Sequence, residues 1–475
     1  MARVLFPAIR WDPGQGFAPA ARSIDVALEL GVGGFILFGG PAAAVRELTG
    51  DLRARSAAPL VIGADLERGA GQQFAGAVSL PPAAAFGAIG DLGATRRAGE
   101  LTGREARALG VDWIYAPVAD LDAEPSNPIV GTRAYGADPA VVSAHVAAWI
   151  DGCRSAGALA CAKHFPGHGR TVTDSHLGLP VVEASRAALE ADLRPFRAAL
   201  EHGVDAVMTA HVAYPAVDPG GGPATLSAAI VTGLLRGELG FRGLVVTDAL
   251  VMAGVLGPVA DEAQAAVAAL AAGCDVLLCP ADPERVAAAL ESARGRALPE
   301  ARIAEAARRV EDAACRVASP RPGEWDRGED RDWACDIAAR ALFVVRGAPA
   351  LAGRRIDLVT VDDDVGGPFP PGPRASFPAT LTASGIEVRE AAAPAGPAVV
   401  ALYADVRGWK GRPHVSRAAR ERLEQALAVR PGATVVLFGH PRLAAQVPGD
   451  AVLAAWSGDP VMQEAAARWL AGHAR

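Results

Sequence analysis

The sequence predicts an α/β protein with an N-terminal (β/α)8 barrel of the TIM type, followed by a smaller three-layer α/β/α sandwich domain. Short, continuous apolar runs alternate with longer amphipathic stretches over residues 1–316. Residues 317–332 are rich in proline, glycine and charge, and the alternation starts again in 333–475. Strands that are apolar throughout are typical of a parallel sheet buried on both faces. We therefore expect a barrel over 1–316, a linker over 317–332 and a C-terminal domain over 333–475.

The barrel prediction rests on repeated pairs of one short strand pattern and one helical pattern. Eight such pairs in about 300 residues match the size of a (β/α)8 barrel. The expected strands are 3–9, 33–39, 60–65, 111–118, 158–164, 205–211, 243–248 and 275–279. The expected helices include 41–56, 94–110, 138–156, 185–202, 226–237, 259–272 and 282–296.

The same patterns organise the C-terminal domain, where fewer strands predict a smaller sheet with helices on both faces. The expected strands are 342–346, 356–361, 387–390, 398–403, 434–438 and 451–456, and the expected helices are 374–384, 415–428 and 459–471.

Composition and charge exclude several classes of protein. The 475 residues are 51% hydrophobic and 21% charged, which allows a large buried core and rules out intrinsic disorder. The net charge is -7 and no Lys/Arg-rich run is present, so we expect no nucleic-acid partner. No window approaches 18 uncharged apolar residues, so no membrane partner is expected either. A small-molecule substrate is the remaining expectation.

The cysteines and the N-terminus indicate the compartment. The six cysteines lack C-x-x-C or Cys/His zinc spacing, and most lie in apolar runs. This pattern predicts free thiols, a reducing environment and no structural metal. The N-terminal apolar stretch is too short for a signal peptide and lacks a small-residue cleavage site. We therefore expect a cytoplasmic protein.

Lysine is almost absent from the chain. Only Lys163 and Lys410 occur among the 46 basic residues, and the rest are arginine. Such a bias fits GC-rich coding, under which a retained lysine requires a reason. Lys163 ends a predicted barrel strand, where a compact ammonium differs from a guanidinium in reach and hydrogen-bond geometry. We expect Lys163 to be functional, whereas Lys410 has no assigned task.

Polar residues end five of the predicted barrel strands, and active sites of such barrels form at the C-terminal ends of the strands. Asp248 could be a metal ligand, a hydrogen-bond acceptor or a nucleophile, and the lack of metal-binding residues near it in the sequence leaves the last two. Asp65, and Arg133 on a loop bracketed by glycines, could clamp vicinal hydroxyls. The full set of strand ends is Asp65, Asp120, Lys163 with His164, His211 and Asp248.

The segment from Lys163 to His176 is the densest cluster of reactive side chains. It reads Lys163-His-Phe-Pro-Gly-His-Gly-Arg-Thr-Val-Thr-Asp-Ser-His176, and its Pro-Gly pair predicts a loop. A metal site would need helical i, i+4 histidine spacing or a cysteine partner, and neither is present. A merely solvated loop would leave the retained lysine unexplained.

Asp174 and His176 are separated by one residue, so in an extended loop their side chains point the same way and can hydrogen-bond. A carboxylate on one imidazole nitrogen fixes the tautomer and raises the basicity of the other nitrogen. The pair could therefore donate and accept a proton near neutral pH. The alternative is a local turn hydrogen bond without a catalytic role.

In their order along the barrel, these motifs resemble glycoside hydrolase family 3, and in particular its β-N-acetylhexosaminidase branch. The resemblance rests on the Lys163-His-Phe-Pro-Gly-His-Gly and Asp174-Ser-His176 motifs, on Val246-Thr-Asp248 and on Gly131-Thr-Arg-Ala-Tyr-Gly136. It implies a retaining exo-β-N-acetylglucosaminidase that acts on soluble cell-wall or chitin-type fragments. It implies no cofactor.

The resemblance also implies a role for each site residue. Asp248 would be the nucleophile that forms a covalent glycosyl-enzyme. His176, oriented by Asp174, would protonate the leaving oxygen and then deprotonate water. The remaining residues would bind the sugar: Asp65, Arg133, Lys163, His164 and His211.

Two departures from the family pattern bear on the substrate. The usual Asp-x-Glu-Gly-Gly-Arg, with a further Arg three residues on, reads here Asp65-Leu-Glu-Arg-Gly-Ala-Gly-Gln-Gln73. Gln73 stands where the second arginine is expected, so Arg68 or no residue replaces that contact. The second departure is the C-terminal domain, which many single-barrel bacterial members of the resembled branch lack. In the β-glucosidase branch that domain supplies the acid/base carboxylate, which the Asp174/His176 loop makes unnecessary here.

Three other functions stay open. A phosphorylase would use the same residues but pass the glycosyl unit to phosphate, an anion that a neutral histidine tolerates better than a glutamate does. A β-glucosidase would need an acid from the second domain. A non-catalytic sugar-binding protein would show decay at the nucleophile or the dyad, and both are intact in the sequence.

Overall fold

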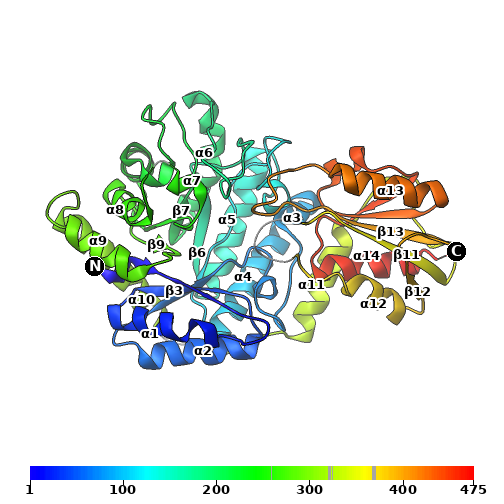
Figure 1. Ribbon diagram of the computed structural model, residues 1–475, viewed down its shortest axis with the longest axis horizontal. Helices are drawn as coiled ribbons and strands as arrows, with labels where there is room; N and C mark the ends of the chain where they lie inside the picture. The colour runs from blue at the N-terminus through cyan, green and yellow to red at the C-terminus, as the bar shows by residue number, and fades with distance from the viewer. Residues whose placement is uncertain (258, 319–322, 324, 366–370, 475) are drawn as a thin grey trace. The chain divides into compact units, whose positions relative to one another are not determined.

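The computed structural model of the chain describes residues 1–257, 259–318, 323, 325–365 and 371–474, and it consists of two compact units (Figure 1). The barrel unit comprises residues 1–78, 92–123 and 136–327. The second unit comprises residues 79–91, 124–135 and 328–475.

The strands of the barrel unit are all parallel, and they close on themselves. Strands β2 to β8 form one sheet in sequence order, and β1 pairs with β9. Because β1 and β2 flank Pro7 in one extended segment, this segment joins β3 on one side and β9 on the other. The β8 and β9 segments meet where Thr247 N–H donates to Val276 O at 3.0 Å. The strands are β1 (Leu5–Phe6), β2 (Ala8–Arg10), β3 (Gly34–Phe38), β4 (Val61–Ala64), β5 (Trp113–Ile114), β6 (Leu159–Phe165), β7 (Ala206–Thr209), β8 (Leu244–Thr247) and β9 (Leu277–Leu278).

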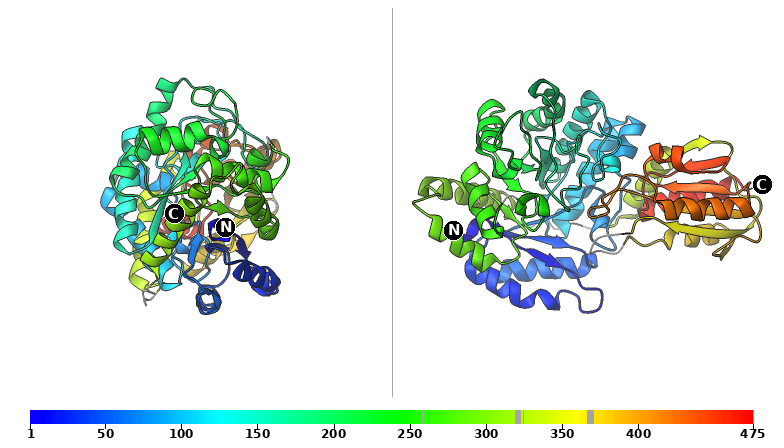
Figure 2. Two further views of the ribbon diagram at one scale, coloured as in Figure 1. Left: turned by 90° about the vertical axis from the view of Figure 1, so that its left-hand side faces the viewer. Right: turned by 45° about the horizontal axis from the view of Figure 1, so that its top comes forward.

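Helices surround these strands (Figure 2), as the (β/α)8 prediction requires. The helices are α1 (Ala21–Leu30), α2 (Ala42–Arg55), α4 (Leu92–Ala108), α5 (Pro139–Ser155), α6 (Arg186–Glu201), η6 (Ala229–Glu238), α7 (Ala253–Leu256), α8 (Glu262–Ala272), α9 (Pro283–Ala293) and α10 (Glu300–Val317). Side-chain oxygens of Asp138, Ser185 and Asp261 cap the N-termini of α5, α6 and α8. The fold class is therefore confirmed.

Several barrel elements differ from the sequence prediction, and two of them show why. The predicted strand 111–118 contains β5 and, after a break, an isolated parallel bridge between Val118 and Lys163. Pro117 lies within this break and has no N–H to donate to a neighbouring strand. The predicted helix 226–237 is η6, which starts at Ala229 and has π-helical hydrogen bonds. Both differences depend on backbone hydrogen bonding, to which hydrophobic periodicity is not sensitive.

Aromatic and small residues share the interior of the barrel. The ring of Trp113 lies 5.8 Å from that of Phe6 and 4.9 Å from that of Tyr115. A Cβ atom at Gly63 would lie 2.6 Å from the Tyr115 hydroxyl oxygen, so β4 needs glycine there. This packing fixes the strands whose ends carry the polar residues.

The second unit is a three-layer sandwich, as predicted. Its six-stranded sheet has the order β10-β15-β14-β13-β11-β12, and only β10 is antiparallel to its neighbour. Helix α13 covers one face, and α11, α12 and α14 cover the other (Figure 1). The elements are α11 (Gly328–Ala341), β10 (Phe343–Arg346), β11 (Arg355–Asp362), α12 (Ser376–Ala383), β12 (Glu387–Glu390), β13 (Ala398–Tyr403), α13 (Arg417–Val429), β14 (Thr434–Phe438), β15 (Ala451–Ala454) and α14 (Pro460–Gly472).

The division between the units differs from the predicted boundaries. Helix α10 extends to Val317 and α11 begins at Gly328, so helices occupy both ends of the predicted 317–332 linker, of which 319–322 and 324 lie outside the described residues. Residues 79–91 and 124–135 also belong to the second unit. They carry α3 (Ala83–Ile89) and η4 (Gly131–Arg133). Long-range packing of this kind leaves no mark in local composition.

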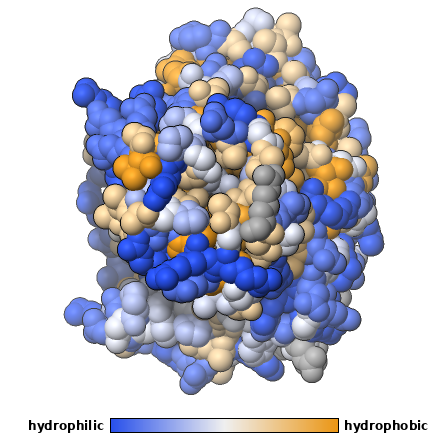
Figure 3. Space-filling view, turned by 90° about the vertical axis from the view of Figure 1, so that its right-hand side faces the viewer, coloured by the Kyte–Doolittle hydropathy of each residue, from blue (hydrophilic) through white to orange (hydrophobic). Residues whose placement is uncertain are grey.

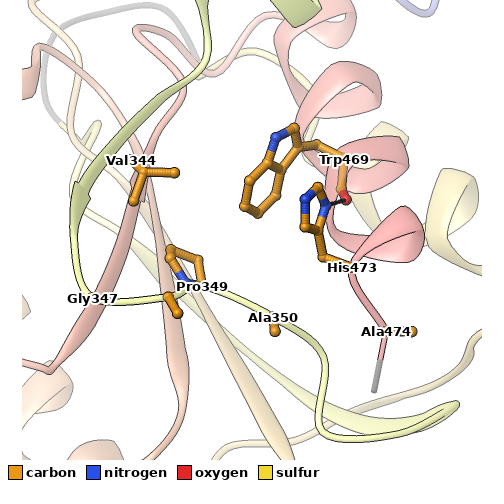
Figure 4. Close-up of a pocket in the computed structure, with 8 residues that line it drawn as sticks. Val344, Gly347, Pro349, Ala350, Trp469, His473 and Ala474 are labelled. Carbon is orange, nitrogen blue, oxygen red and sulfur yellow. Dashed lines mark hydrogen bonds between the residues drawn. The ribbon is translucent and has the colours of Figure 1, made fainter.

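Other features of the second unit carry no predicted site residue. A cavity of about 370 Å³ is lined mainly by apolar residues, with the rings of Trp469 and His473 stacked 3.9 Å apart at one side (Figure 4). On the face of the molecule shown in Figure 3, hydrophilic residues are interspersed with hydrophobic patches.

Candidate active site

Seven of the eight predicted site residues lie in the barrel unit, at or just after the C-terminal ends of its strands. Asp65 follows β4, Lys163 and His164 lie in β6, and Asp248 follows β8. His211 lies two residues after β7. Asp174 and His176 lie on the loop after β6, and parallel pairing brings all of these strand ends to one edge of the barrel.

Lys163 joins two strands through a buried ion pair. Its Nζ atom lies 2.6 Å from Asp65 Oδ1 and 2.7 Å from Glu67 Oε1. The Lys163 side chain is 2% exposed, whereas that of Asp65 is 29% exposed. Lys163 therefore orients Asp65 and leaves it accessible. Sequence reasoning missed Glu67, although its spacing of two residues from Asp65 places both carboxylates on one side of an extended segment.

Asp120 links His164 to the start of the next loop. Its Oδ2 atom lies 2.7 Å from His164 Nδ1, and its Oδ1 atom accepts backbone N–H groups from His164 and His168. Burial alone would raise the pKa of Asp120, but the two histidines hold it below the ordinary value. The sequence marked Asp120 as a strand end, but it gave the residue no role.

Asp174 and His176 form the expected hydrogen bond. His176 Nδ1 lies 2.7 Å from Asp174 Oδ1, which also accepts the His176 backbone N–H at 2.9 Å. The Asp174 side chain is fully buried and that of His176 is 18% exposed. With Nδ1–H donating to Asp174, the other ring nitrogen, Nε2, is the atom that can exchange a proton with a bound molecule.

Asp248 is an ionised carboxylate among histidines. Burial would raise its pKa, but His164, His211, His176 and the N–H of Ala249 outweigh burial and lower the pKa to about 2. Asp248 Oδ1 accepts the Ala249 N–H at 2.7 Å. The group is therefore an anion over the pH range in which a carboxylate nucleophile is needed.

His211 stays a prediction as a sugar-binding residue, and the structure gives both of its ring nitrogens protein partners. It is fully buried, with Nδ1 2.8 Å from Thr225 Oγ1 and Nε2 3.1 Å from the carbonyl oxygen of Ala249. Burial lowers the pKa of His211. Both ring nitrogens thus lie within hydrogen-bond distance of protein oxygens. The contact with the Ala249 carbonyl oxygen supports the backbone next to Asp248.

Arg133 is the one predicted site residue outside the barrel unit. It lies on η4 in the second unit, where its Nη1 donates to Ile129 O at 3.1 Å. The hydroxyl of Thr132, the preceding residue, donates to Asp405 Oδ1 at 2.6 Å. Arg133 therefore belongs to the second unit, and its role as a sugar-binding residue stays a prediction.

Gln73 and Arg68, in the loop after β4 that departs from the family pattern, both have partners in the structure. Gln73 Oε1 accepts the backbone N–H of Gly39 at 3.2 Å, which joins this loop to the turn after β3. The Arg68 backbone N–H donates to Gln72 Oε1 at 2.8 Å. The Gln73 side chain thus supports the backbone at Gly39, which lies 34 residues earlier in the sequence.

Within the described residues, no group of three or more His, Cys, Asp or Glu side chains is placed to hold a metal ion. In that same part of the chain, no helix combines the length and apolar character that crossing a membrane requires. All six cysteines are free thiols.

A family comparison agrees with the site residues. The model for the glycosyl hydrolase family 3 N-terminal domain matches residues 15–313, which include the whole cluster described above. The chain belongs to glycosyl hydrolase family 3. It is therefore a glycoside hydrolase, and the resemblance drawn from the motifs is confirmed.

Relatives of this family 3 enzyme that are similar to it in sequence include proteins named as hexosaminidases. A β-hexosaminidase of Xanthomonas oryzae pv. oryzae is 40% identical over 285 residues, which cover 57% of this chain and 83% of that protein. A β-N-acetylglucosaminidase/β-glucosidase of Cellulomonas fimi is 39% identical over 259 residues, which cover 52% of this chain and 46% of that protein.

Solved structures match both units. A family 3 β-N-acetylglucosaminidase from Paenibacillus sp. superposes with a TM-score of 0.86 at 30% identity, over 99% of this chain and 96% of that chain. A β-glucoside phosphorylase superposes with a TM-score of 0.87 at 23% identity, over 99% and 91% of the two chains, and shows the shared fold alone.

Proposed function

We propose that this family 3 enzyme is a retaining exo-β-N-acetylglucosaminidase. Its substrates would be soluble cell-wall or chitin-type fragments that end in N-acetylglucosamine. The observation that carries the proposal is the hydrogen bond between His176 and Asp174 on the loop after β6, close to an ionised Asp248. The names of the Xanthomonas and Paenibacillus relatives support the choice of sugar.

The first step uses Asp248 and His176 together. The Asp248 carboxylate attacks the anomeric carbon while the bond from that carbon to the leaving oxygen breaks. His176 donates its Nε2 proton to the leaving oxygen. Asp174 accepts the Nδ1–H of the ring and balances its positive charge before transfer, so the dyad carries little net charge beside Asp248.

The second step reverses the direction of proton transfer. His176 Nε2, now unprotonated, takes a proton from a water molecule as that water attacks the anomeric carbon. The bond to Asp248 breaks and the carboxylate returns to its ionised form. Two displacements at one carbon give net retention of configuration.

Sugar recognition falls to the polar residues around these two groups. Asp65, held by Lys163, would accept hydroxyl hydrogens of the terminal sugar. His164 Nδ1 is hydrogen-bonded to Asp120, so the other ring nitrogen, Nε2, would bind a sugar hydroxyl. Arg133 stays a prediction as a further sugar-binding residue, and so does the cytoplasmic location.

Hydrolysis of an aryl N-acetylglucosaminide and of the matching aryl glucoside, each with and without phosphate, tests the proposal. We expect cleavage of the N-acetylglucosaminide to the free β-sugar, seen first as the β-anomer by NMR, and loss of this activity in Asp248→Ala. Absence of any cleavage, or an initial α-anomer, would contradict the proposal.

Phosphorolysis is the second candidate. It is favoured by the acid/base group, because an imidazole paired with one carboxylate admits an anionic acceptor more readily than a carboxylate does. Formation of a sugar 1-phosphate in the same assay would show that the enzyme is a phosphorylase and not a hydrolase. Faster cleavage of the glucoside than of the N-acetylglucosaminide would instead favour a β-glucosidase.

A further inference from the structure

His168 is a buried histidine that the reaction does not use. It lies on the loop after β6, and both of its ring nitrogens contact hydroxyl groups of that loop. Nδ1 lies 2.8 Å from Thr171 Oγ1, and Nε2 lies 3.1 Å from Ser175 Oγ. The side chain therefore spans the loop from its start to the residue between Asp174 and His176.

Ser175 is held from two directions. Its side chain contacts His168, while its carbonyl oxygen accepts the backbone N–H of Gly254 at 2.9 Å. Gly254 lies in α7, six residues after Asp248. A Cβ atom at Gly254 would lie 2.9 Å from the Ser175 carbonyl oxygen, so glycine permits this close approach. Ser175 thus ties the loop to the segment that follows Asp248.

His168 is itself fixed by the residue that orients His164. Its backbone N–H donates to Asp120 Oδ1 at 2.6 Å, and the other oxygen of Asp120 holds His164 Nδ1. Burial lowers the pKa of His168 to about 4, so the ring is neutral near pH 7. A neutral imidazole has one donor and one acceptor, which two hydroxyl groups can satisfy together.

We propose that His168 is a positioning residue that holds Ser175, and through it the Asp174–His176 pair, in place for proton transfer beside Asp248. The inference rests on the proposed function, because it needs His176 as the acid/base group. His168 itself contacts no substrate. Its loss would leave the nucleophile in place and displace the proton donor.

Leaving-group dependence separates this role from a general structural one. A dinitrophenyl N-acetylglucosaminide departs without a proton, whereas the phenyl compound needs one from the enzyme. Ser175→Ala removes one hydrogen bond and His168→Phe removes both while filling most of the space. We expect each variant to lose about tenfold or more in kcat for glycosylation on the phenyl compound, with a much smaller loss on the dinitrophenyl compound.

His145→Gln is the matched control. His145 is a buried histidine of α5 in the same unit, with Nδ1 2.8 Å from Thr95 Oγ1, and it lies outside the site. This variant should lower thermal stability without changing the ratio of rates on the two substrates. If the His168 and Ser175 variants lose equally on both substrates, as His145→Gln does, the positioning role is wrong.

His176→Ala in the same assay distinguishes failure of the inference from failure of the proposed function. It should show the strongest leaving-group dependence of all the variants. If His176→Ala shows none, the acid/base assignment fails, and the inference fails with it. If His176→Ala shows the dependence but Ser175→Ala and His168→Phe do not, only the inference fails.

Discussion

The ammonium of Lys163 lies 2.6 Å from Asp65 Oδ1 across 98 residues of sequence. The second partner, Glu67, lies 2.7 Å away, so one buried cation joins the end of β6 to the loop after β4. This ion pair accounts for a lysine where the chain otherwise uses arginine, because a guanidinium is larger and planar and would not occupy the same position between two carboxylates.

Lys163→Arg should therefore impair activity without unfolding the protein. We expect kcat/KM to fall about 100-fold, because Asp65 would be displaced from the sugar hydroxyl that it binds. Steady-state kinetics and the circular dichroism spectrum measure the two effects. Arg417→Lys, at a side chain that is 89% exposed, is the control for exchanging the two cations. Kinetics within twofold of wild type for Lys163→Arg would contradict this account.

Asp174→Asn should weaken proton transfer more than binding. An amide can still accept the His176 Nδ1–H, but it does not balance the charge of the protonated ring. We expect kcat for a phenyl glycoside to fall by about 100-fold or more, with KM changed little. Equal losses of kcat/KM, which reports the glycosylation step, on phenyl and dinitrophenyl substrates would show that Asp174 acts only on stability.

The ionisation of Asp248 predicts a pH dependence of stability. Its pKa is lowered to about 2 in the folded protein, so its contribution is present above its unfolded value near 4 and is lost as pH falls towards 2. As the pH falls over this range, we expect the unfolding free energy of the wild type to decrease by about 2 kcal/mol more than that of Asp248→Asn. Denaturant unfolding of both proteins at several pH values from about pH 5 to about pH 2 measures this difference in unfolding free energy. A difference that stays constant with pH would contradict the assignment.

Lys410 has a structural role that the sequence did not indicate. Its Nζ atom donates to Asp405 O at 2.7 Å and lies 3.2 Å from Asp364 Oδ1, and the side chain is 3% exposed. Lys410→Met should destabilise the second unit by about 3 kcal/mol, because it leaves a buried carboxylate without this partner. Urea unfolding measures the loss, with Arg417→Met as the exposed control. An unchanged free energy of unfolding in Lys410→Met would contradict this structural role.

The sequence predicts those parts of the site that depend on short spacing. Asp174 and His176 are two residues apart, and this spacing predicts their hydrogen bond. The expected extended conformation is wrong, because Ser175 to Leu177 form a turn in which Asp174 O accepts the Leu177 N–H at 2.9 Å. Strand ends identify Asp65 and Asp248, because continuous apolar runs stop there. The partners of Lys163 and Gln73 lie 98 and 34 residues away, and only the closed barrel brings them together.

The same distinction holds for the fold. Periodicity finds the strands and most helices, since it reports burial along a single element. It does not assign residues 79–91 and 124–135 to the second unit, because that depends on packing between distant segments such as α3 and α11. The assignment of Arg133 to the second unit depends on the same kind of packing.

The most direct test of the account is to trap the covalent intermediate. His176→Ala removes the base that the second displacement needs, so a dinitrophenyl N-acetylglucosaminide should load Asp248 faster than water releases the sugar. Mass spectrometry of the intact protein and of its peptides should then show one N-acetylglucosamine unit on Asp248. An adduct on another residue, or wild-type turnover with no adduct in the variant, would contradict the mechanism.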